Sequence, residues 1–363
     1  MPVDTLYMDA NATEKLRPAA RAAVIAALEA GGNPSSVHAA GRGARRVLES
    51  AREAVAARFA TRPQDVVFTS GGTEANALAI AGLGRGRRVL VGATEHPAVL
   101  AAAPGAAVIP VLPDGTADLA ALAALLAEGG PALVCLMAAN NETGVLHPLA
   151  EAAALCRTHG ALLHVDAVQA AGRVALPAGW DSLALSGHKL GGPPGAGALL
   201  LRPGLELAPL IAGGGQERGR RGGTEPLPAI AGLAAALPEA GEAARLAALR
   251  DRIEAGVASL APEAIIAGAG APRLPNTSCI ILPGAAAETQ VIALDLAGVR
   301  VSAGAACSSG KVARSPVLAA MGFAELAGCG VRVSLPWDAP VDAAERVLAA
   351  WGAMRARVVR RAA

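Results

Sequence analysis

Through the middle of this chain, short runs of branched apolar residues alternate with longer stretches rich in Ala, Leu, Glu and Arg. The short runs have the length and composition of strands, and they predict strands at 66–68, 88–91, 132–137, 162–165, 182–185 and 198–201. The stretches between them predict helices, among them 74–83, 118–128 and 149–159. A strand–helix–strand order favours an α/β fold, in which helices cover both faces of a largely parallel sheet.

The pattern changes after about residue 238. A long helix predicted over 239–260 leads into expected strands at 278–282 and 330–334, with further helices expected at 288–296 and 341–357. This order is typical of a smaller α+β domain. The chain has 363 residues, 53% hydrophobic and only 2% aromatic, so we expect two cores built mainly from Ala, Leu and Val. We expect residues 14–240 to form the large domain, and residues 1–13 with 241–363 to form the small one.

Charge and cysteine usage restrict the partners and the compartment. The formal net charge is +2, which gives no sign of a nucleic-acid partner or an anionic membrane surface. The five cysteines include no Cys-x-x-Cys pair, so neither a disulfide framework nor a metal site is expected. The start of the chain lacks a signal-peptide pattern, and no apolar run reaches membrane-spanning length. A cytoplasmic protein is the expectation.

Lys189 follows a predicted buried strand, in a chain that carries most of its positive charge on arginine. It lies in the segment Ser186-Gly-His-Lys189 and is followed by glycines. Burial lowers the pKa of a lysine amine and makes it a nucleophile that can form a Schiff base. A turn lysine in solvent is the alternative, and this segment alone does not separate the two.

Asp166 ends the expected strand at 162–165, where a buried carboxylate needs a partner. A protonated pyridine nitrogen is such a partner, although helix capping is the ordinary role of an aspartate in this position. A third segment, 68–76, runs from a strand through two glycines into a helix, and free N–H groups at a helix start suit a phosphate. Many turns share that short pattern. Ligands bind open parallel sheets at the strand carboxyl ends, so these elements are expected to meet there.

Taken together, these segments resemble the class V aminotransferase family of fold-type I pyridoxal-phosphate enzymes, and within it the cysteine desulfurases. The resemblance runs from Met8 to about Ser334 and rests on the order and spacing of short motifs. They are MDANAT (8–13), GNPSSVH (32–38), TSGGTE (69–74), TEH (94–96), NNETG (140–144), HVDAVQ (164–169), SGHK (186–189), GGGQER (213–218), RGGT (221–224) and SAGAACSS (302–309). The resemblance implies a large domain with a mostly parallel seven-stranded sheet flanked by helices, and a smaller α+β domain.

The resemblance also implies a pyridoxal 5'-phosphate site. Lys189 would form the Schiff base, Asp166 would pair with the pyridinium nitrogen, and Gln169 would hydrogen bond the phenolic oxygen. His96 would stack on the ring, a role that rests on the family because a lone histidine is more often a core or surface residue. The phosphate would be held by Gly72, Thr73, Ser186 and His188. In a homodimer, Thr224 would reach the phosphate of the neighbouring subunit.

Substrate and sulfur transfer follow from the same resemblance. L-cysteine would be bound by residues that include Asn11, Asn33, Asn141 and Arg332, with Asn141 also touching the cofactor. Lys189 would take the Cα proton, and the thiolate of Cys307 would accept the sulfur as a persulfide while alanine leaves. A sulfur-acceptor protein, in iron–sulfur cluster assembly or another sulfur-transfer route, would then receive it. Free cysteine is often a buried small hydrophobe, but the Ser- and Gly-rich setting of Cys307 favours the nucleophile. The other four cysteines lie in apolar contexts and are expected to be structural.

Some features depart from the family pattern, and other functions compete. Lys311-Val-Ala-Arg-Ser-Pro316 lacks the acidic residue that relatives commonly carry, Pro336-Trp-Asp338 replaces a glycine-led turn, and the chain ends soon after its last expected helix. These departures leave the identity of the sulfur acceptor open.

A selenocysteine lyase or a transaminase of the same family is the nearest alternative function. A catalytically inactive dimeric partner protein would normally have lost Lys189, Asp166 or Cys307, and a Rossmann dehydrogenase lacks its Gly-x-Gly-x-x-Gly motif here.

Overall fold

The computed structural model of the chain describes residues 5–237, 242–304 and 314–362. A seven-stranded sheet forms the centre of the larger part, with the strand order β2-β8-β7-β6-β5-β3-β4. Its strands are β2 (Val66–Thr69), β3 (Arg88–Gly92), β4 (Ala107–Ile109), β5 (Ala132–Met137), β6 (Leu162–Asp166), β7 (Ser182–Ser186) and β8 (Gly197–Leu201). All pairs are parallel except those made by β8, which runs antiparallel to β2 and β7. The predicted mostly parallel seven-stranded sheet is confirmed.

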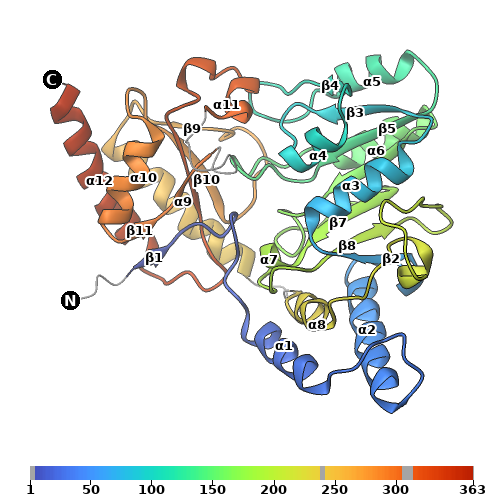
Figure 1. Cartoon of the computed structure of the whole chain (residues 1–363). Helices are drawn as coiled ribbons and strands as arrows, with labels where there is room; N and C mark the ends of the chain where they lie inside the picture. Colours follow the sequence, from blue (N-terminus) through green and yellow to red (C-terminus); the bar gives the residue numbers. More distant parts are fainter. Residues whose placement is uncertain (1–4, 238–241, 305–313, 363) are drawn as a thin grey trace.

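Helices cover both faces of this sheet because its strands are apolar on both sides (Figure 1). Successive residues of a strand point to opposite faces, and along β5 Val134 and Leu136 join one core while Leu133 and Cys135 join the other. The first core also receives α2 (Ala39–Arg58), α5 (Leu119–Ala127), α6 (Leu149–Thr158) and α8 (Leu227–Ala235). The second receives α3 (Gly72–Leu83) and α4 (Pro97–Ala102).

A second sheet lies in the C-terminal part. It has four strands in the order β12-β13-β10-β9, all antiparallel, namely β9 (Ile265–Ile266), β10 (Thr277–Ile281), β12 (Ser302–Ala303) and β13 (Gly330–Ser334). The core beside it includes residues of α9 (Glu242–Leu260), α10 (Ala287–Leu296) and α12 (Ala343–Ala362), among them the fully buried Trp351. The N-terminal strand β1 (Leu6–Tyr7) pairs with β11 (Val299–Arg300), so the start of the chain lies beside this part (Figure 1).

The other elements are short or connect the two parts. They are α1 (Pro18–Ala30), α7 (Gly187–Leu190), α11 (Pro316–Ala320), and the 3-10 turns η1 (Pro63–Asp65), η2 (Gln216–Gly219) and η3 (Ala324–Leu326). Among the described residues, no helix combines the length and the apolar character needed to cross a bilayer. The carboxyl ends of β2, β5, β6 and β7 meet at one edge of the large sheet, and the candidate site lies along that edge.

Candidate active site

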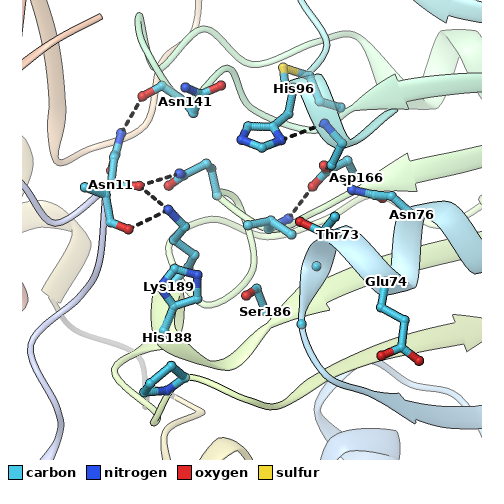
Figure 2. A pocket seen from close by; sticks show the side chains of 18 of the residues that line it. Asn11, Thr73, Glu74, Asn76, His96, Asn141, Asp166, Ser186, His188 and Lys189 are labelled. Carbon is cyan, nitrogen blue, oxygen red and sulfur yellow. Dashed lines mark hydrogen bonds between the residues drawn. The ribbon is translucent and has the colours of Figure 1, made fainter. Parts of the chain in front are cut away.

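A cavity of about 510 Å³ opens at the carboxyl edge of the large sheet (Figure 2). It brings together most of the residues that the sequence predicted for the site, namely Asn11, Gly72, Thr73, His96, Asn141, Asp166, Gln169, Ser186, His188, Lys189 and Arg332. Asn33 and Thr224 do not line it, and both are exposed in this chain. Cys307 lies outside the described residues. The cavity is therefore formed by strand ends of the large sheet, by the N-terminal segment and by one residue of the second sheet.

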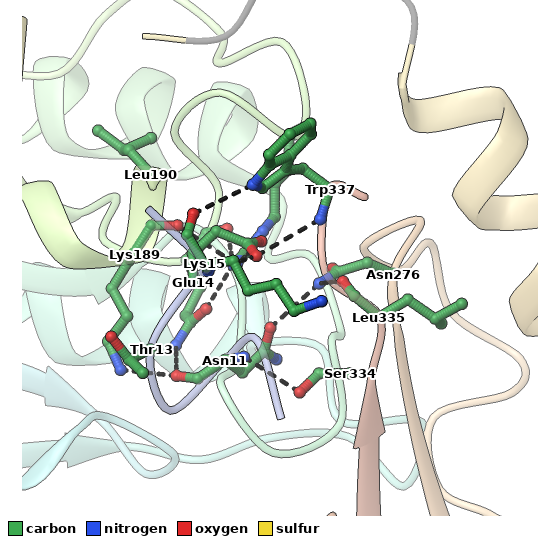
Figure 3. A network of polar contacts seen from close by, with 12 residues as sticks. Asn11, Thr13, Glu14, Lys15, Lys189, Leu190, Asn276, Ser334, Leu335 and Trp337 are labelled. Atoms are coloured by element: carbon green, nitrogen blue, oxygen red, sulfur yellow. Dashed lines mark hydrogen bonds and ion pairs between the residues drawn. The ribbon is translucent and has the colours of Figure 1, made fainter. Parts of the chain in front are cut away.

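Lys189 lies in α7, directly after β7, and its amine is directed toward the N-terminal segment. Its Nζ donates hydrogen bonds to the backbone oxygen of Asn11, at 2.6 Å, and to that of Ala12, at 2.7 Å. The Asn11 side chain is in turn tied to the second sheet through Thr277 Oγ1 at 2.9 Å. Figure 3 shows this N-terminal segment running between Lys189 and residues 334–337. The position of the lysine amine thus depends on both parts of the molecule.

Asp166 ends β6 and lies at the bottom of the cavity, where it is only 6% exposed. Burial raises the pKa of its carboxyl, while hydrogen bonds from the Val168 N–H, at 2.9 Å, and from Asn76 Nδ2, at 2.7 Å, act against that rise. In the described part of the chain, hydrogen bonds from neutral groups, and not an arginine, contact this carboxylate. A carboxylate in this position offers its charge to a cationic ring nitrogen.

A buried chain of hydrogen bonds behind Asp166 fixes the orientation of Asn76. Because Asn76 donates to Asp166, its Oδ1 must accept, and it accepts from His164 Nε2 at 2.9 Å. The other nitrogen of His164 then accepts from Ser182 Oγ at 2.8 Å. Complete burial lowers the pKa of His164 to about 3 and keeps the ring neutral. Sequence reasoning gave no role to Asn76 or His164, because nothing in their local pattern shows that they meet Asp166.

His96 precedes α4 and faces the cavity from the side of β3 and β5. Its Nδ1 accepts from the Ala98 N–H at 3.1 Å, so the proton of the neutral ring is on Nε2. Burial lowers its pKa, which favours that neutral form. Glu95 lies just behind it, with Oε1 accepting from the Met137 N–H at 2.5 Å. Burial, and then the charge of Asp166, raise the pKa of Glu95 well above its usual value.

The start of α3 forms the opposite end of the cavity. Gly71 caps the helix and Gly72 begins it, and Thr73 and Ser186 line the cavity with them. A Cβ on Gly72 would lie 2.6 Å from Val168 Cγ2, so only glycine lets the backbone approach so closely. Glu74 in this first turn is paired with Arg221 at 2.8 Å. Its charge is therefore largely compensated, and the helix start can attract an anion.

Gln169 and Arg332 complete the polar lining. Gln169 donates from Nε2 to the Asn11 carbonyl at 2.9 Å and accepts from Arg173 at 2.6 Å, so its amide has one orientation. Arg332, on β13, pairs with Asp9 at 2.7 Å and donates to the Asn141 carbonyl at 3.1 Å, while its Nε has no partner among the described residues. Each terminal nitrogen of Arg332 uses one N–H in these contacts and keeps a second, which suits donation to a carboxylate.

These residues match the chemistry of pyridoxal phosphate. A lysine amine is available for the aldehyde, a buried carboxylate for the pyridine nitrogen, and a glycine-opened helix start with two hydroxyls for the phosphate. His188 adjoins that end and donates to or accepts from Thr13 Oγ1 at 3.2 Å. Burial lowers the pKa of His188 to about 4. The sizes fit as well, since the cavity is within the usual range for cofactor sites.

Known proteins share both the sequence and the fold. The family described as aminotransferase class-V matches residues 6–347. The cysteine desulfurase of Cereibacter sphaeroides is 44% identical over 338 residues, which cover 88% of this chain and 87% of that protein. The IscS-like cysteine desulfurase of Mycobacterium tuberculosis is 38% identical, over 94% of this chain and 95% of that protein. The X-ray structure of a NifS-like protein from Rickettsia africae gives a TM-score of 0.90 at 32% identity, over 97% of this chain and 99% of that one.

Proposed function

From the premise that this chain belongs to the class V aminotransferase family and is a cysteine desulfurase, we propose that its cofactor is pyridoxal 5'-phosphate. With this cofactor it would convert L-cysteine to L-alanine, and Cys307 would be the first sulfur acceptor. One observation carries the proposal. The amine of Lys189 and the buried carboxylate of Asp166 line one cavity together with the glycine-opened start of α3. An amine, an acid and an anion site in that combination serve pyridoxal phosphate.

Each side chain then has a binding task. Asp166 would pair with the ring nitrogen, His96 would stack on the ring face, and Gln169 would donate to the phenolic oxygen. Gly72, Thr73, Ser186 and His188 would hold the phosphate. The substrate carboxylate would be held by Arg332 and Asn141, with Asn11 and Asn33 also predicted at the substrate. Support comes from the hydrogen bonds that hold Asp166, Gln169 and Arg332 in single orientations.

Two residues of this chain would carry out the chemical steps, one as a base and one as a nucleophile. Bound pyridoxal phosphate supplies an electron sink, which weakens the bonds at Cα and between Cβ and sulfur. Lys189 Nζ would take the proton from Cα of L-cysteine. The Cys307 thiolate would attack the substrate sulfur, so that an S–S bond forms as the C–S bond breaks. Cys307 then carries a persulfide, and alanine leaves after Cβ gains a proton in place of the sulfur and a proton returns to Cα.

We extend the proposal to the assembly. Residues 14–240 would form the large cofactor-binding domain, and residues 1–13 with 241–363 the small domain, in keeping with the separate seven-stranded and four-stranded sheets. Two such chains would form a homodimer in which Thr224 of each reaches the phosphate of the other. An acceptor protein would take the sulfur from Cys307. The described cysteines are all free thiols, which supports a reducing, cytoplasmic compartment.

Cofactor attachment tests the proposal without requiring turnover. Purified protein supplied with pyridoxal phosphate should absorb visible light, and borohydride should attach the cofactor covalently to the peptide that contains Lys189. Lys15, which pairs with Asp338 on the surface, provides the control: Lys15→Ala should label like the native protein and Lys189→Ala should not. Labelling that persists in Lys189→Ala would refute the assigned role of this lysine.

A further inference from the structure

Glu142 is a buried carboxylate that has no part in the proposed binding or chemistry. It follows Asn141 in the turn after β5, and it is only 4% exposed. The turn is rigid because Asn140 Oδ1 accepts from the N–H groups of both Glu142 and Thr143, each at 2.9 Å. Burial raises the pKa of the Glu142 carboxyl. A costly group of this kind is retained where its contacts have a function or hold a structure together.

Glu142 contacts two residues that lie far from it in the sequence. Glu142 Oε2 accepts a 2.6 Å hydrogen bond from Ser315 Oγ, which also accepts from the Leu318 N–H and so caps α11. The same oxygen faces Gly304, directly after β12: a Cβ added to Gly304 would collide with it, and the Glu142 Cδ would be 3.3 Å away. One carboxylate oxygen therefore contacts residues 304 and 315, which flank the segment that contains Cys307.

The turn that carries Glu142 also belongs to the substrate end of the cavity. The Asn141 carbonyl accepts from Arg332 NH1 and from Asn11 Nδ2, each at 3.1 Å. Arg332 in turn is paired across the sheet with Ser302, two residues before Gly304. The groups expected to hold the substrate carboxylate and the two ends of the Cys307 segment therefore share one rigid turn.

We propose that Glu142 is a positioning residue for sulfur transfer, which fixes both ends of the Cys307 segment relative to the substrate-binding turn. The inference rests on the proposed function, because it assigns Cys307 as the sulfur acceptor. Glu142 is not among the described residues that line the cavity, so it would act through the segments that it contacts. Its removal should slow the transfer step and leave cofactor binding and the cysteine KM nearly unchanged.

The test is a double-mutant cycle in the holoenzyme, with the rate of alanine formation in the first turnover as readout. Glu142→Ala and Gly304→Ala should each lower that rate by at least about tenfold, with the KM for L-cysteine and the visible absorption unchanged. The double variant should be no slower than the slower single variant, because the added methyl no longer meets a carboxylate. Glu142→Gln retains an oxygen for Ser315 and should keep most of the rate.

Gly270→Ala is the matched control, because a Cβ there would meet nothing within 4 Å; its rate should equal that of the native protein. If both single variants transfer sulfur at the native rate, or if their losses multiply in the double variant, the role of Glu142 is refuted. Failure of the proposed function has a different signature, since the native holoenzyme would then form no alanine from L-cysteine. Gly304→Ala keeps the test decisive should Glu142→Ala fail to fold.

Discussion

Asp166 shows at the scale of single residues how this site holds a charge away from water. Two hydrogen bonds hold the carboxylate, and one of them is oriented by His164 through Asn76. Both nitrogens of His164 are hydrogen bonded, to Asn76 and Ser182, and complete burial of the ring keeps it neutral. Sequence reasoning identified Asp166 from its place at a strand end. It did not identify Asn76 or His164, since their roles arise from contacts between separate elements.

The neutrality of His164 predicts a pH dependence of stability. Its pKa is lowered to about 3 in the folded protein and is about 6.5 in an unfolded chain, so between those values only the unfolded state binds the proton. Stability contributed by His164 is therefore lost as the pH falls below 6.5, by about 1.4 kcal/mol per pH unit. Urea unfolding at pH 7 and pH 5 should show a steeper acid loss for the native protein than for His164→Gln. Equal slopes would contradict a neutral, buried His164.

The contact between Arg173 and Gln169 leads to a second prediction at the residue scale, which concerns the titration of the bound cofactor. Arg173 donates to Gln169 Oε1 at 2.6 Å, which leaves Gln169 Nε2 to donate to the Asn11 carbonyl at 2.9 Å and, with its second N–H, to the phenolic oxygen as proposed. The charge of Arg173 is compensated by Glu14 at 3.6 Å. In Arg173→Met the amide can turn and the positive charge is lost. Both changes favour the protonated form of the bound chromophore, whose visible titration should move up by about one pH unit. In a Gln169→Leu background most of that shift should disappear; an undiminished shift would show that Arg173 does not act through Gln169.

At the scale of elements, the start of α3 is where backbone geometry determines binding. Gly72→Ala places a methyl 2.6 Å from Val168 Cγ2 and 3.3 Å from Ser186 Cβ, so the helix start must move. We expect the affinity for pyridoxal phosphate to fall by at least about tenfold, measured by equilibrium dialysis of the apoprotein. Gly43→Ala, on α2 with open space around the new Cβ, should bind like the native protein. Native affinity in Gly72→Ala would argue against a phosphate at this helix start.

The elements also show what sequence patterns can and cannot predict. The six strands predicted for the large sheet are all present, because continuous apolar runs identify strands buried on both faces. β4 was missed because two of its three residues are exposed and leave no apolar run. The helices α1, α2 and α8 were not among those named from the sequence. The final helix begins at Ala343, two residues later than predicted.

At the scale of the whole molecule, the cavity depends on segments that are distant in the chain. The N-terminal segment passes between the two sheets: Asn11 N–H donates to Ser334 Oγ at 3.0 Å, while the Asn11 carbonyl accepts from Lys189. Arg332 from the second sheet reaches the Asn141 carbonyl of the first. The sequence motifs named many of the residues that line this cavity. Its assembly across two sheets could be expected only from the family resemblance, because local patterns carry no information about which distant segments meet.

Product analysis tests the central claim most directly. The holoenzyme with L-cysteine and a reductant should release alanine and sulfide in equal amounts. Lys189→Ala and Cys307→Ala should abolish both products, whereas Cys329→Ala, which removes a partly buried thiol elsewhere, should retain them. If the native protein binds pyridoxal phosphate but forms neither product, or if Cys307→Ala releases sulfide at the native rate, the account of this chain as a desulfurase acting through Cys307 is contradicted.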